Sequence, residues 1–321
     1  MIGVIGGGAW GTALAQVMAS TEDVILWARE AQVVEAINTG HENRDFLPGI
    51  ALNPRIRATG NTAELAAADV WLVVAPAQHL RTVLAACPLD HRPVLALCAK
   101  GIEAGTLKLM AEVASDVADA PVAVLSGPTF AGEVARGLPT AVTLACADAT
   151  LGASLVQRLA RPMFRPYLSD DVTGAEIGGA VKNVLAIACG VVEGAGLGLN
   201  ARAALIARGF AEMTRFGLAR GARAETLAGL SGLGDLVLTC SSANSRNFTL
   251  GLGIGQGKAA ADLLAATRTV AEGAATAPVL AAAAKAAGVE MPICAAVAAL
   301  LAGAPLRETV AGLLGRPLTS E

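Results

Sequence analysis

The chain has 321 residues, of which 54% are hydrophobic and 16% are charged. That length is sufficient for two domains of ordinary size, each with its own core. The net charge of -3 provides no sequence-wide positive field of the kind that nucleic-acid binding requires. We therefore expect no nucleic-acid partner.

The 6 cysteines and 3 histidines show no spacing typical of a metal site, and no two cysteines form a CxxC pair. We expect reduced, buried thiols and no metal. Residues 1–21 carry no side-chain charge, but they lack a basic start and are interrupted by glycines, unlike a signal peptide. The uncharged run 291–306 is too short and too broken to span a bilayer. These features favour a cytoplasmic protein without integral membrane association.

Short aliphatic runs alternate with helical segments over the first half of the chain, which predicts βαβ units and a mostly parallel sheet. After residue 170 the periodicity becomes helical. The sequence thus predicts an α/β protein, with a Rossmann-like domain over residues 1–170 and an all-helical domain over residues 171–321. The expected strands are 2–5, 24–27, 70–74, 94–97, 122–125, 141–144 and 164–168, and the expected later helices are 172–193, 200–219, 245–255, 273–287 and 293–302.

A Gly-x-Gly-x-x-Gly pattern, formed by Gly6, Gly8 and Gly11, follows the first strand and opens a helix over residues 12–19. In such a turn the first glycine permits the bend, the second lets the backbone approach a pyrophosphate, and the third packs helix on strand. The context is the one that dinucleotide binding requires. A glycine turn without a ligand is the alternative.

The second strand ends at Trp27 or Ala28, where proteins specific for NAD usually place an acidic residue for the ribose hydroxyls. Here Arg29 and Glu30 follow. An arginine at this place can hold the 2′-phosphate of NADP, which favours acceptance of NADP as well as NAD. A solvated arginine at the start of a helix is the alternative.

Two further motifs directly follow predicted strands, where the carboxyl ends of a parallel sheet line a ligand crevice. Lys100 follows the strand at 94–97, and the alternative for it is a surface lysine in a loop. Gly127 and Thr129 follow the strand at 122–125; the glycine allows close approach and the threonine offers a hydroxyl. By itself this second motif is also compatible with an ordinary turn and helix cap.

Lys182 lies in a helical segment that is apolar on nearly every face, and such a helix is buried. A lysine there must be paired, must reach the surface with its ammonium group, or must be functional. Desolvation lowers the pKa of an amine, which makes a neutral amine available as a general base. A purely structural lysine remains the alternative.

Further along, Asp235 precedes an apolar run and Ser245-Arg246-Asn247 is expected to open a helix. An arginine beside the free N–H groups of a helix start suits a phosphate group. Taken alone, Asp235 is equally compatible with a helix cap and Arg246 with a solvated charge.

Taken together, these segments resemble the NAD(P)-dependent glycerol-3-phosphate dehydrogenase family, in its bacterial biosynthetic branch. The matching segments span nearly the whole chain in one order. They are GGGAWGTALA (6–15), NRDFLPG (43–49), AKGIE (99–103), SGPTFAGEVARGLPTA (126–141), GGAVKNVLAIACG (178–190), NARAALIARG (200–209), GLGDLVLTC (232–240), SRN (245–247) and VAEG (270–273).

The resemblance implies a nucleotide-binding first domain, a substrate-binding and catalytic second domain, and the use of NAD or NADP. Its small-molecule substrates would be sn-glycerol 3-phosphate and dihydroxyacetone phosphate, with Lys182 as the catalytic proton-transfer group. It also implies a homodimer that supplies glycerol 3-phosphate for phospholipid synthesis. By the resemblance, the dinucleotide contacts are Ala9, Trp10, Arg29, Lys100, Ala131, Arg246, Val270 and Glu272, and the substrate contacts are Lys100, Gly127, Thr129, Lys182, Asp235, Ser245, Arg246 and Asn247.

Two other functions use some of the same features. A related β-hydroxyacid dehydrogenase or ketoacid reductase shares the two-domain plan and a helix lysine, but it has no need of the SGPTF and SRN segments. A non-catalytic dinucleotide sensor would need a docking module and would have no use for a buried Lys182.

Overall fold

The computed structural model describes residues 1–266 and 271–317. The chain divides into two compact units. The first comprises Met1–Lys100 and Lys108–Glu176, and the second comprises Gly101–Leu107 and the chain from Ile177 onward. The sequence placed a single boundary between residues 170 and 171. The structural division falls six residues later, inside the continuous helix Val172–Gly194. A change of sequence periodicity can show where this helix begins, but it cannot show the point within the helix at which the two units divide.

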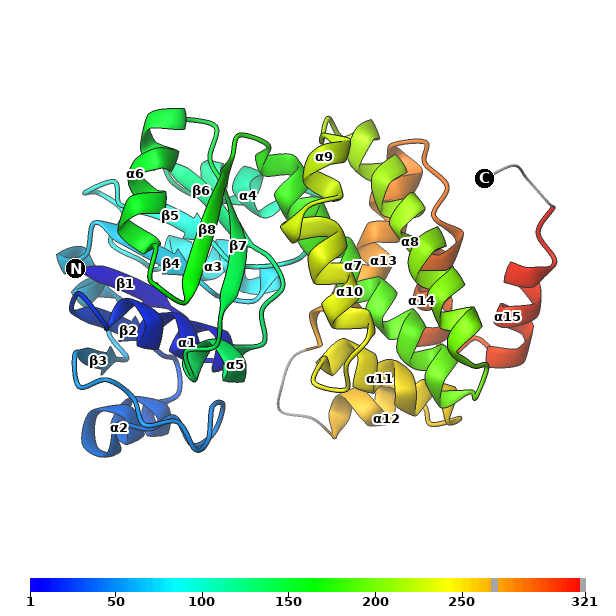
Figure 1. Cartoon of the computed structure of the whole chain (residues 1–321), viewed down its shortest axis with the longest axis horizontal. Helices are drawn as coiled ribbons and strands as arrows, with labels where there is room; N and C mark the ends of the chain where they lie inside the picture. The colour runs from blue at the N-terminus through cyan, green and yellow to red at the C-terminus, as the bar shows by residue number, and fades with distance from the viewer. Residues whose placement is uncertain (267–270, 318–321) are drawn as a thin grey trace. The chain divides into compact units, whose positions relative to one another are not determined.

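An eight-stranded sheet forms the centre of the first unit, in the order β3-β2-β1-β4-β5-β6-β7-β8 (Figure 1). Neighbouring strands are parallel except β6 and β7, which are antiparallel. The mostly parallel sheet confirms the predicted fold class. The strands are β1 (Ile2–Ile5), β2 (Val24–Trp27), β3 (Ile56–Thr59), β4 (Val70–Val73), β5 (Val94–Leu97), β6 (Val122–Ser126), β7 (Thr140–Ala145) and β8 (Phe164–Ser169).

Helices cover both faces of this sheet, which explains why its central strands are continuous apolar runs. In β4, Val70 and Leu72 point into one core cluster while Trp71 and Val73 point into the other, because side chains alternate along a strand. The first cluster is completed by α1 (Ala9–Met18), α2 (Ala31–Gly40) and α6 (Ala149–Leu159), and the second by α3 (Leu80–Ala85) and α4 (Met110–Val117). The remaining elements of this unit are the 3₁₀ turns η1 (Thr62–Ala67) and η2 (Ala77–His79) and the short α5 (Ala131–Ala135).

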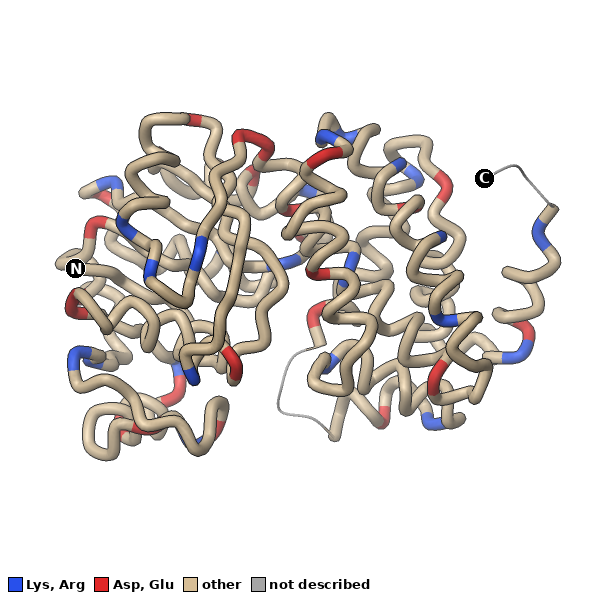
Figure 2. The backbone as a smooth tube through the Cα atoms, in the orientation of Figure 1, with Lys and Arg blue, Asp and Glu red and all other residues tan. Residues whose placement is uncertain are grey.

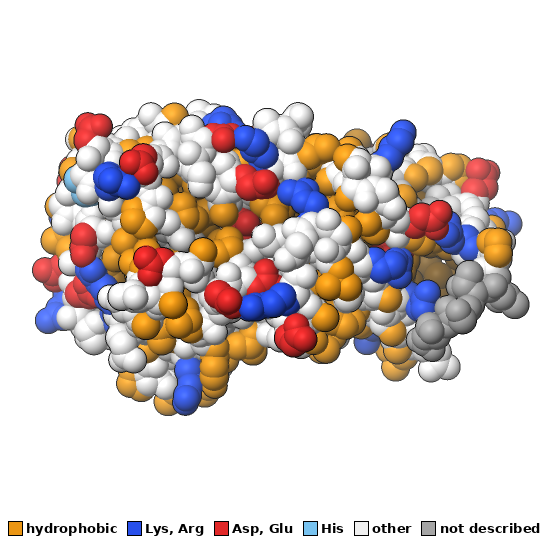
Figure 3. Space-filling model, turned by 90° about the horizontal axis from the view of Figure 1, so that it is seen from above, with side chains coloured by type: hydrophobic (Ala, Val, Ile, Leu, Met, Phe, Trp, Pro, Cys, Tyr) orange, Lys and Arg blue, Asp and Glu red, His pale blue; other side chains and the backbone are white. Residues whose placement is uncertain are grey.

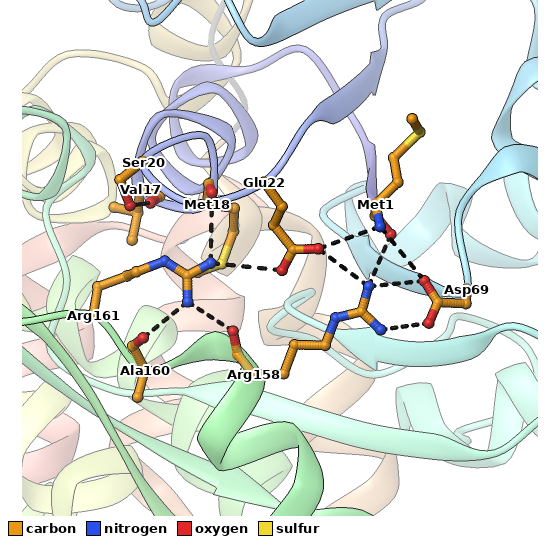
Figure 4. Close-up of polar contacts among 9 residues, drawn as sticks. All are labelled: Met1, Val17, Met18, Ser20, Glu22, Asp69, Arg158, Ala160 and Arg161. Atoms are coloured by element: carbon orange, nitrogen blue, oxygen red, sulfur yellow. Dashed lines mark hydrogen bonds and ion pairs between the residues drawn. The ribbon is translucent and has the colours of Figure 1, made fainter.

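A charged cluster lies at the amino ends of the strands (Figure 4). Arg158 on α6 pairs with Asp69, which directly precedes β4, and lies 3.2 Å from Glu22, which shortly precedes β2. Arg161 also approaches Glu22, at 3.7 Å. The hydrogen bond from Arg158 lowers the pKa of Asp69 to about 2. The amino ends are opposite to the carboxyl ends where ligands bind in such sheets, so this cluster contributes to stability away from any ligand.

From Ile177 onward, the regular elements of the second unit that the structure describes are all helices. The predicted helices recur within two residues of their expected bounds as α7 (Val172–Gly194), α8 (Leu199–Ala219), α11 (Arg246–Gly255), α13 (Glu272–Ala286) and α14 (Pro292–Leu301). The sequence did not predict α9 (Ala224–Leu227), α10 (Asp235–Cys240), α12 (Ala260–Ala265) and α15 (Leu306–Leu314), nor the π-helical turn η3 (Leu230–Gly234).

Helix α7 is buried on all sides, since every residue from Gly174 to Val192 is buried. Its length and composition would also suit a membrane-spanning helix, but the apolar window is 100% buried inside the protein. That is the packing of a core helix, as the sequence predicted for this segment.

Pairs of glycines allow α7 and α11 to cross with their backbones in contact. A Cβ atom on Gly190 or Gly194 of α7 would overlap backbone atoms of α11, and one on Gly251 or Gly255 of α11 would overlap backbone atoms of α7. Both helices thus carry glycines four residues apart at the crossing, the spacing that permits close helix approach. This contact fixes the position of the start of α11 along α7.

Acidic and basic residues are interspersed along both units (Figure 2). On the face shown in Figure 3 they are scattered among polar and apolar side chains rather than gathered by sign. This pattern accords with the net charge of -3.

Candidate active site

The glycine-rich turn between β1 and α1 uses its glycines for different reasons. Gly6 has φ +125°, which side-chain-bearing residues rarely adopt. Side chains at Gly7 and Gly11 would overlap Ala28 and the Gly6 carbonyl, respectively. At Gly8, the N-cap of α1, a Cβ atom would meet nothing within 4 Å. The fold therefore requires the other three glycines, whereas the absence of a side chain at Gly8 leaves room above the start of a helix.

The residues around this turn agree with a nucleotide site. Ala9 and Trp10 are half-buried in the first turn of α1, and α5, which begins at Ala131, packs against α1. All three pack on the same core cluster. The turn, its open helix start and these apolar neighbours fit the pyrophosphate and the flat rings of a dinucleotide.

Arg29 follows β2, as predicted, with a side chain that is 79% exposed. Its guanidinium group pairs with Glu30 at 2.7 Å. An exposed pair of this kind is weak, so a phosphate group can compete for the arginine.

Lys100, Gly127 and Thr129 come together at the carboxyl ends of β5 and β6. The Lys100 amine donates a hydrogen bond to the Gly127 carbonyl at 3.1 Å, and the Thr129 hydroxyl lies 3.4 Å from the same oxygen. A side chain at Gly127 would press on the backbone of Val142 in β7, so only glycine allows this approach. The structure thus places a cation and a hydroxyl at the carboxyl ends of these two strands, as predicted.

In the second unit, Lys182 is paired rather than isolated. It is 8% exposed, and its Nζ donates hydrogen bonds to Asp235 Oδ1 and to Thr239 Oγ1, both at 2.9 Å. The Thr239 hydroxyl lies 2.6 Å from the backbone oxygen of Asp235. The amine is therefore oriented by two acceptors from one short helix, α10.

Thr239 is a residue that the sequence analysis did not select, although it lies within the GLGDLVLTC segment. Its signal is the spacing of four residues from Asp235, which places two side chains on one helix face. That spacing is informative only once a helix is known to begin at Asp235. The sequence does not reveal this start, because the π-helical η3 directly precedes it.

The buried Ser231 in η3 has a hydroxyl without a hydrogen-bond partner.

The Ser245-Arg246-Asn247 segment opens α11, as predicted. Ser245 is the N-cap and accepts a hydrogen bond from Phe248 N at 3.2 Å, while Arg246 is exposed at the first helical position. Asn247 is buried; it donates to Asn183 Oδ1 at 2.9 Å and accepts from Gly273 N at 3.0 Å. Asn247 thus joins the residue after Lys182 to the start of α13.

Of the predicted VAEG contacts, Glu272 is half-buried at the first position of α13, and Val270 lies outside the described residues.

The candidate site residues form two groups, one in each unit. The first contains the glycine turn with Lys100, Gly127 and Thr129, and the second contains Lys182, Asp235, Asn247 and Thr239. Within residues 1–266 and 271–317 no group of three or more His, Cys, Asp or Glu side chains could hold a metal ion.

Comparisons with known proteins identify the family of the chain. Residues 1–152 match the family model of the NAD-dependent glycerol-3-phosphate dehydrogenase N-terminus, and residues 171–310 match that of its C-terminus. The glycerol-3-phosphate dehydrogenase [NAD(P)+] of Novosphingobium aromaticivorans is 64% identical, covering 100% of this chain and 98% of its own. That of Caulobacter vibrioides is 59% identical, with the same coverage of 100% and 98%.

Solved structures give the same result. The crystal structure of glycerol-3-phosphate dehydrogenase from Coxiella burnetii superposes with a TM-score of 0.93 at 37% identity, over 98% of each chain. A ketopantoate reductase from Ralstonia eutropha reaches a TM-score of 0.61 at 16% identity, covering 94% of this chain and 97% of its own, which shows a shared fold only. The chain therefore belongs to the NAD-dependent glycerol-3-phosphate dehydrogenase family.

Proposed function

We propose that Lys182 is the proton-transfer group in an NAD(P)-dependent interconversion of sn-glycerol 3-phosphate and dihydroxyacetone phosphate. The observation that carries this assignment is the buried amine held at 2.9 Å by both Asp235 and Thr239. A fixed amine of this kind has the orientation that general acid–base catalysis needs. Membership of the family removes the two alternatives, a ketoacid reductase and a dinucleotide sensor.

When bound, the nicotinamide accepts or donates the hydride at C4. The residues of the chain deal with the proton on the C2 oxygen of the substrate. In the oxidation, neutral Lys182 takes the proton of the C2 hydroxyl; in the reduction, its ammonium form polarises the carbonyl and returns the proton. Asp235 balances the charge of the ammonium form, because an unpaired buried charge is strongly unfavourable.

The proposed dinucleotide site is the turn formed by Gly6, Gly8 and Gly11, with further contacts from Ala9, Trp10, Lys100, Ala131, Arg246, Val270 and Glu272. The open space at Gly8 supports this proposal, because it leaves the helix start accessible to a pyrophosphate. Arg29 is proposed to bind the 2′-phosphate when NADP is used. We assign residues 1–170 to nucleotide binding and residues 171–321 to substrate binding and catalysis.

The substrate phosphate is proposed to bind at the start of α11. Arg246 is exposed there and supplies a guanidinium group beside backbone N–H groups. Lys100, Gly127, Thr129, Asp235, Ser245 and Asn247 complete the proposed substrate site. The supporting observations are the grouping of Lys100 with Thr129 at the carboxyl ends of β5 and β6, and the buried amide of Asn247.

Spectrophotometric assays with NADH and NADPH test the substrate. Dihydroxyacetone phosphate should be reduced far more efficiently than dihydroxyacetone, because a site built for a charged group loses those interactions when the group is absent. Comparable kcat/KM values for the two ketones would contradict the phosphate site.

Lys182→Met tests the proton-transfer role, with the exposed Lys285→Met as its matched control. Methionine fills a similar volume without a buried charge. The Lys182 variant should lose roughly 10²- to 10⁴-fold in kcat, the usual contribution of general acid–base catalysis, while it still binds NADH. A folded Lys182 variant with most of its turnover would show that the lysine is structural.

The family resemblance also supports a homodimer in the cytoplasm that produces glycerol 3-phosphate for phospholipid synthesis. Sedimentation of the purified protein over a range of concentrations tests the dimer, and a single species with the mass of one chain would refute it.

A further inference from the structure

Asn43, in the loop between α2 and β3, is fully buried and has every hydrogen-bonding atom of its amide in use. Its Nδ2 donates to the Gly7 carbonyl and to Thr12 Oγ1, each at 2.8 Å. Its Oδ1 accepts from Phe46 N at 3.2 Å. An asparagine amide offers two donor hydrogens and one acceptor oxygen, so this side chain is fully engaged inside the protein.

The partners of Asn43 belong to the glycine-rich turn. Gly7 lies between Gly6 and Gly8 in the turn, and Thr12 is the fourth residue of α1. The Thr12 hydroxyl also lies 3.4 Å from the Gly7 carbonyl, so three side-chain and backbone groups close a triangle. The loop that carries Asn43 is held in turn by Leu47 N, which donates to the Asn43 carbonyl at 2.9 Å.

This triangle fixes the direction of one peptide group. In a trans peptide the C=O and the following N–H point in opposite directions. With the Gly7 carbonyl held toward Asn43, the N–H of Gly8 points away from Asn43. On the same residue, a Cβ atom would meet nothing within 4 Å, so the space around Gly8 is open. A pyrophosphate at the start of α1 would be bound by N–H groups with that orientation.

We propose that Asn43 is a positioning residue of the dinucleotide site, which orients the Gly7–Gly8 peptide for pyrophosphate binding without touching the cofactor. The inference rests on the proposed assignment of the glycine turn as the cofactor site. It predicts that loss of the Asn43 amide weakens cofactor binding and leaves the chemical step unchanged.

The test compares Asn43→Ala and Thr12→Val with Asn38→Ala as the control. Asn38, on α2, also makes two hydrogen bonds to backbone, but its partner in both is Ala58 of β3 and not a residue of the glycine turn. We measure KM for NADH, NADPH and dihydroxyacetone phosphate, kcat at saturating cofactor, and thermal unfolding with and without NADH. Thr12→Val preserves side-chain shape, so it provides the test if Asn43→Ala does not fold.

Asn43→Ala and Thr12→Val should each raise KM for the two cofactors roughly tenfold, as expected when one or two buried hydrogen bonds no longer order the glycine-rich turn. Their kcat at saturating cofactor should stay within about twofold of wild type, and Asn38→Ala should leave all constants unchanged. An unchanged cofactor KM in Asn43→Ala and Thr12→Val, or an equal increase in Asn38→Ala, overturns the proposal.

Gly8→Val separates this proposal from the site assignment on which it rests. The space at Gly8 accommodates a side chain in the fold, but that side chain would occupy the proposed pyrophosphate position. If Gly8→Val loses NADH binding while Asn43→Ala binds normally, the role of Asn43 is wrong and the site assignment stands. If Gly8→Val binds NADH normally, the site assignment is itself wrong, and the positioning role fails with it.

Discussion

Replacement of Thr239 by valine should slow catalysis while the protein stays folded. Valine has nearly the shape of threonine but cannot accept the hydrogen bond that Lys182 Nζ donates to Thr239 Oγ1 at 2.9 Å. It also removes the hydroxyl that lies 2.6 Å from the Asp235 backbone oxygen. Of the two acceptors on α10 that orient the Lys182 amine, Asp235 would remain and Thr239 would be lost.

The size of the effect follows from the chemistry of the lost contact. A hydrogen bond to a charged group contributes about 1.5–3 kcal/mol, and each 1.36 kcal/mol in an activation barrier changes a rate tenfold. If the contact contributes this free energy in the transition state and not in the bound ground state, its loss should lower kcat roughly 10- to 150-fold. KM for NADPH should not change, because the proposed cofactor turn is in the other unit.

Steady-state kinetics in both directions give the measurement, and thermal unfolding monitors the fold. Thr239→Ser is the matched control, since it retains the hydroxyl and loses one methyl group; its kcat should remain within about threefold of wild type. The reasoning is refuted if Thr239→Val turns over within twofold of wild type, or if the serine and valine variants are equally slow.

Three further outcomes concern stability and reactivity. Ser231→Ala should leave Tm unchanged or raise it, because it removes a buried hydroxyl that has no partner; a clear loss of Tm would contradict this. Burial raises the pKa of Cys87 to about 11 and of Cys98 to about 12, so neither thiol should be alkylated quickly by iodoacetamide at pH 8 in the native protein, whereas both should react after denaturation, as mass spectrometry would show. Arg158→Ala should lower Tm at pH 7. The penalty in the free energy of unfolding should be about 1 kcal/mol or less, because the Asp69 side chain is 67% exposed. Since Arg158 depresses the Asp69 pKa to about 2, that penalty is present above the ordinary pKa of about 4 and should shrink as the pH falls from about 4 toward 2; a penalty independent of pH would contradict the ion pair.

Most of the strands that the sequence predicted are buried on both faces, because a continuous apolar run is visible without any knowledge of neighbours. The exception is the edge strand β8, which was predicted although several of its residues are exposed. The strand that it missed, β3, has only four residues, lies at the edge of the sheet and exposes Arg57. The reversed direction of β7 relative to β6 was equally hidden. A buried apolar run such as that of β7 has the same character in either direction, and only the path of the connection through α5 decides how the strand runs.

The candidate site shows a similar division. Lys182 was found because a charge inside an apolar helix is conspicuous, and Asp235 was found because it belongs to a recognisable segment. The contact between them, and the part played by Thr239, depend on where α10 begins. That start is set by the π-helical η3, whose geometry arises from tertiary packing; a side chain at Gly178 of α7, for instance, would overlap the backbone of Ser231.

The glycine crossing of α7 and α11 also limits how this enzyme can change during evolution. Because glycines four residues apart interlock with the opposing backbone, α11 cannot slide along α7 by a fraction of a turn. The next arrangement that preserves the contact is one whole turn away, about 5.4 Å. A shift of that size would carry Arg246 and Asn247 far from their present neighbours. Acceptance of a larger or smaller substrate would therefore have to evolve through replacement of individual side chains, on a helix pair that remains fixed.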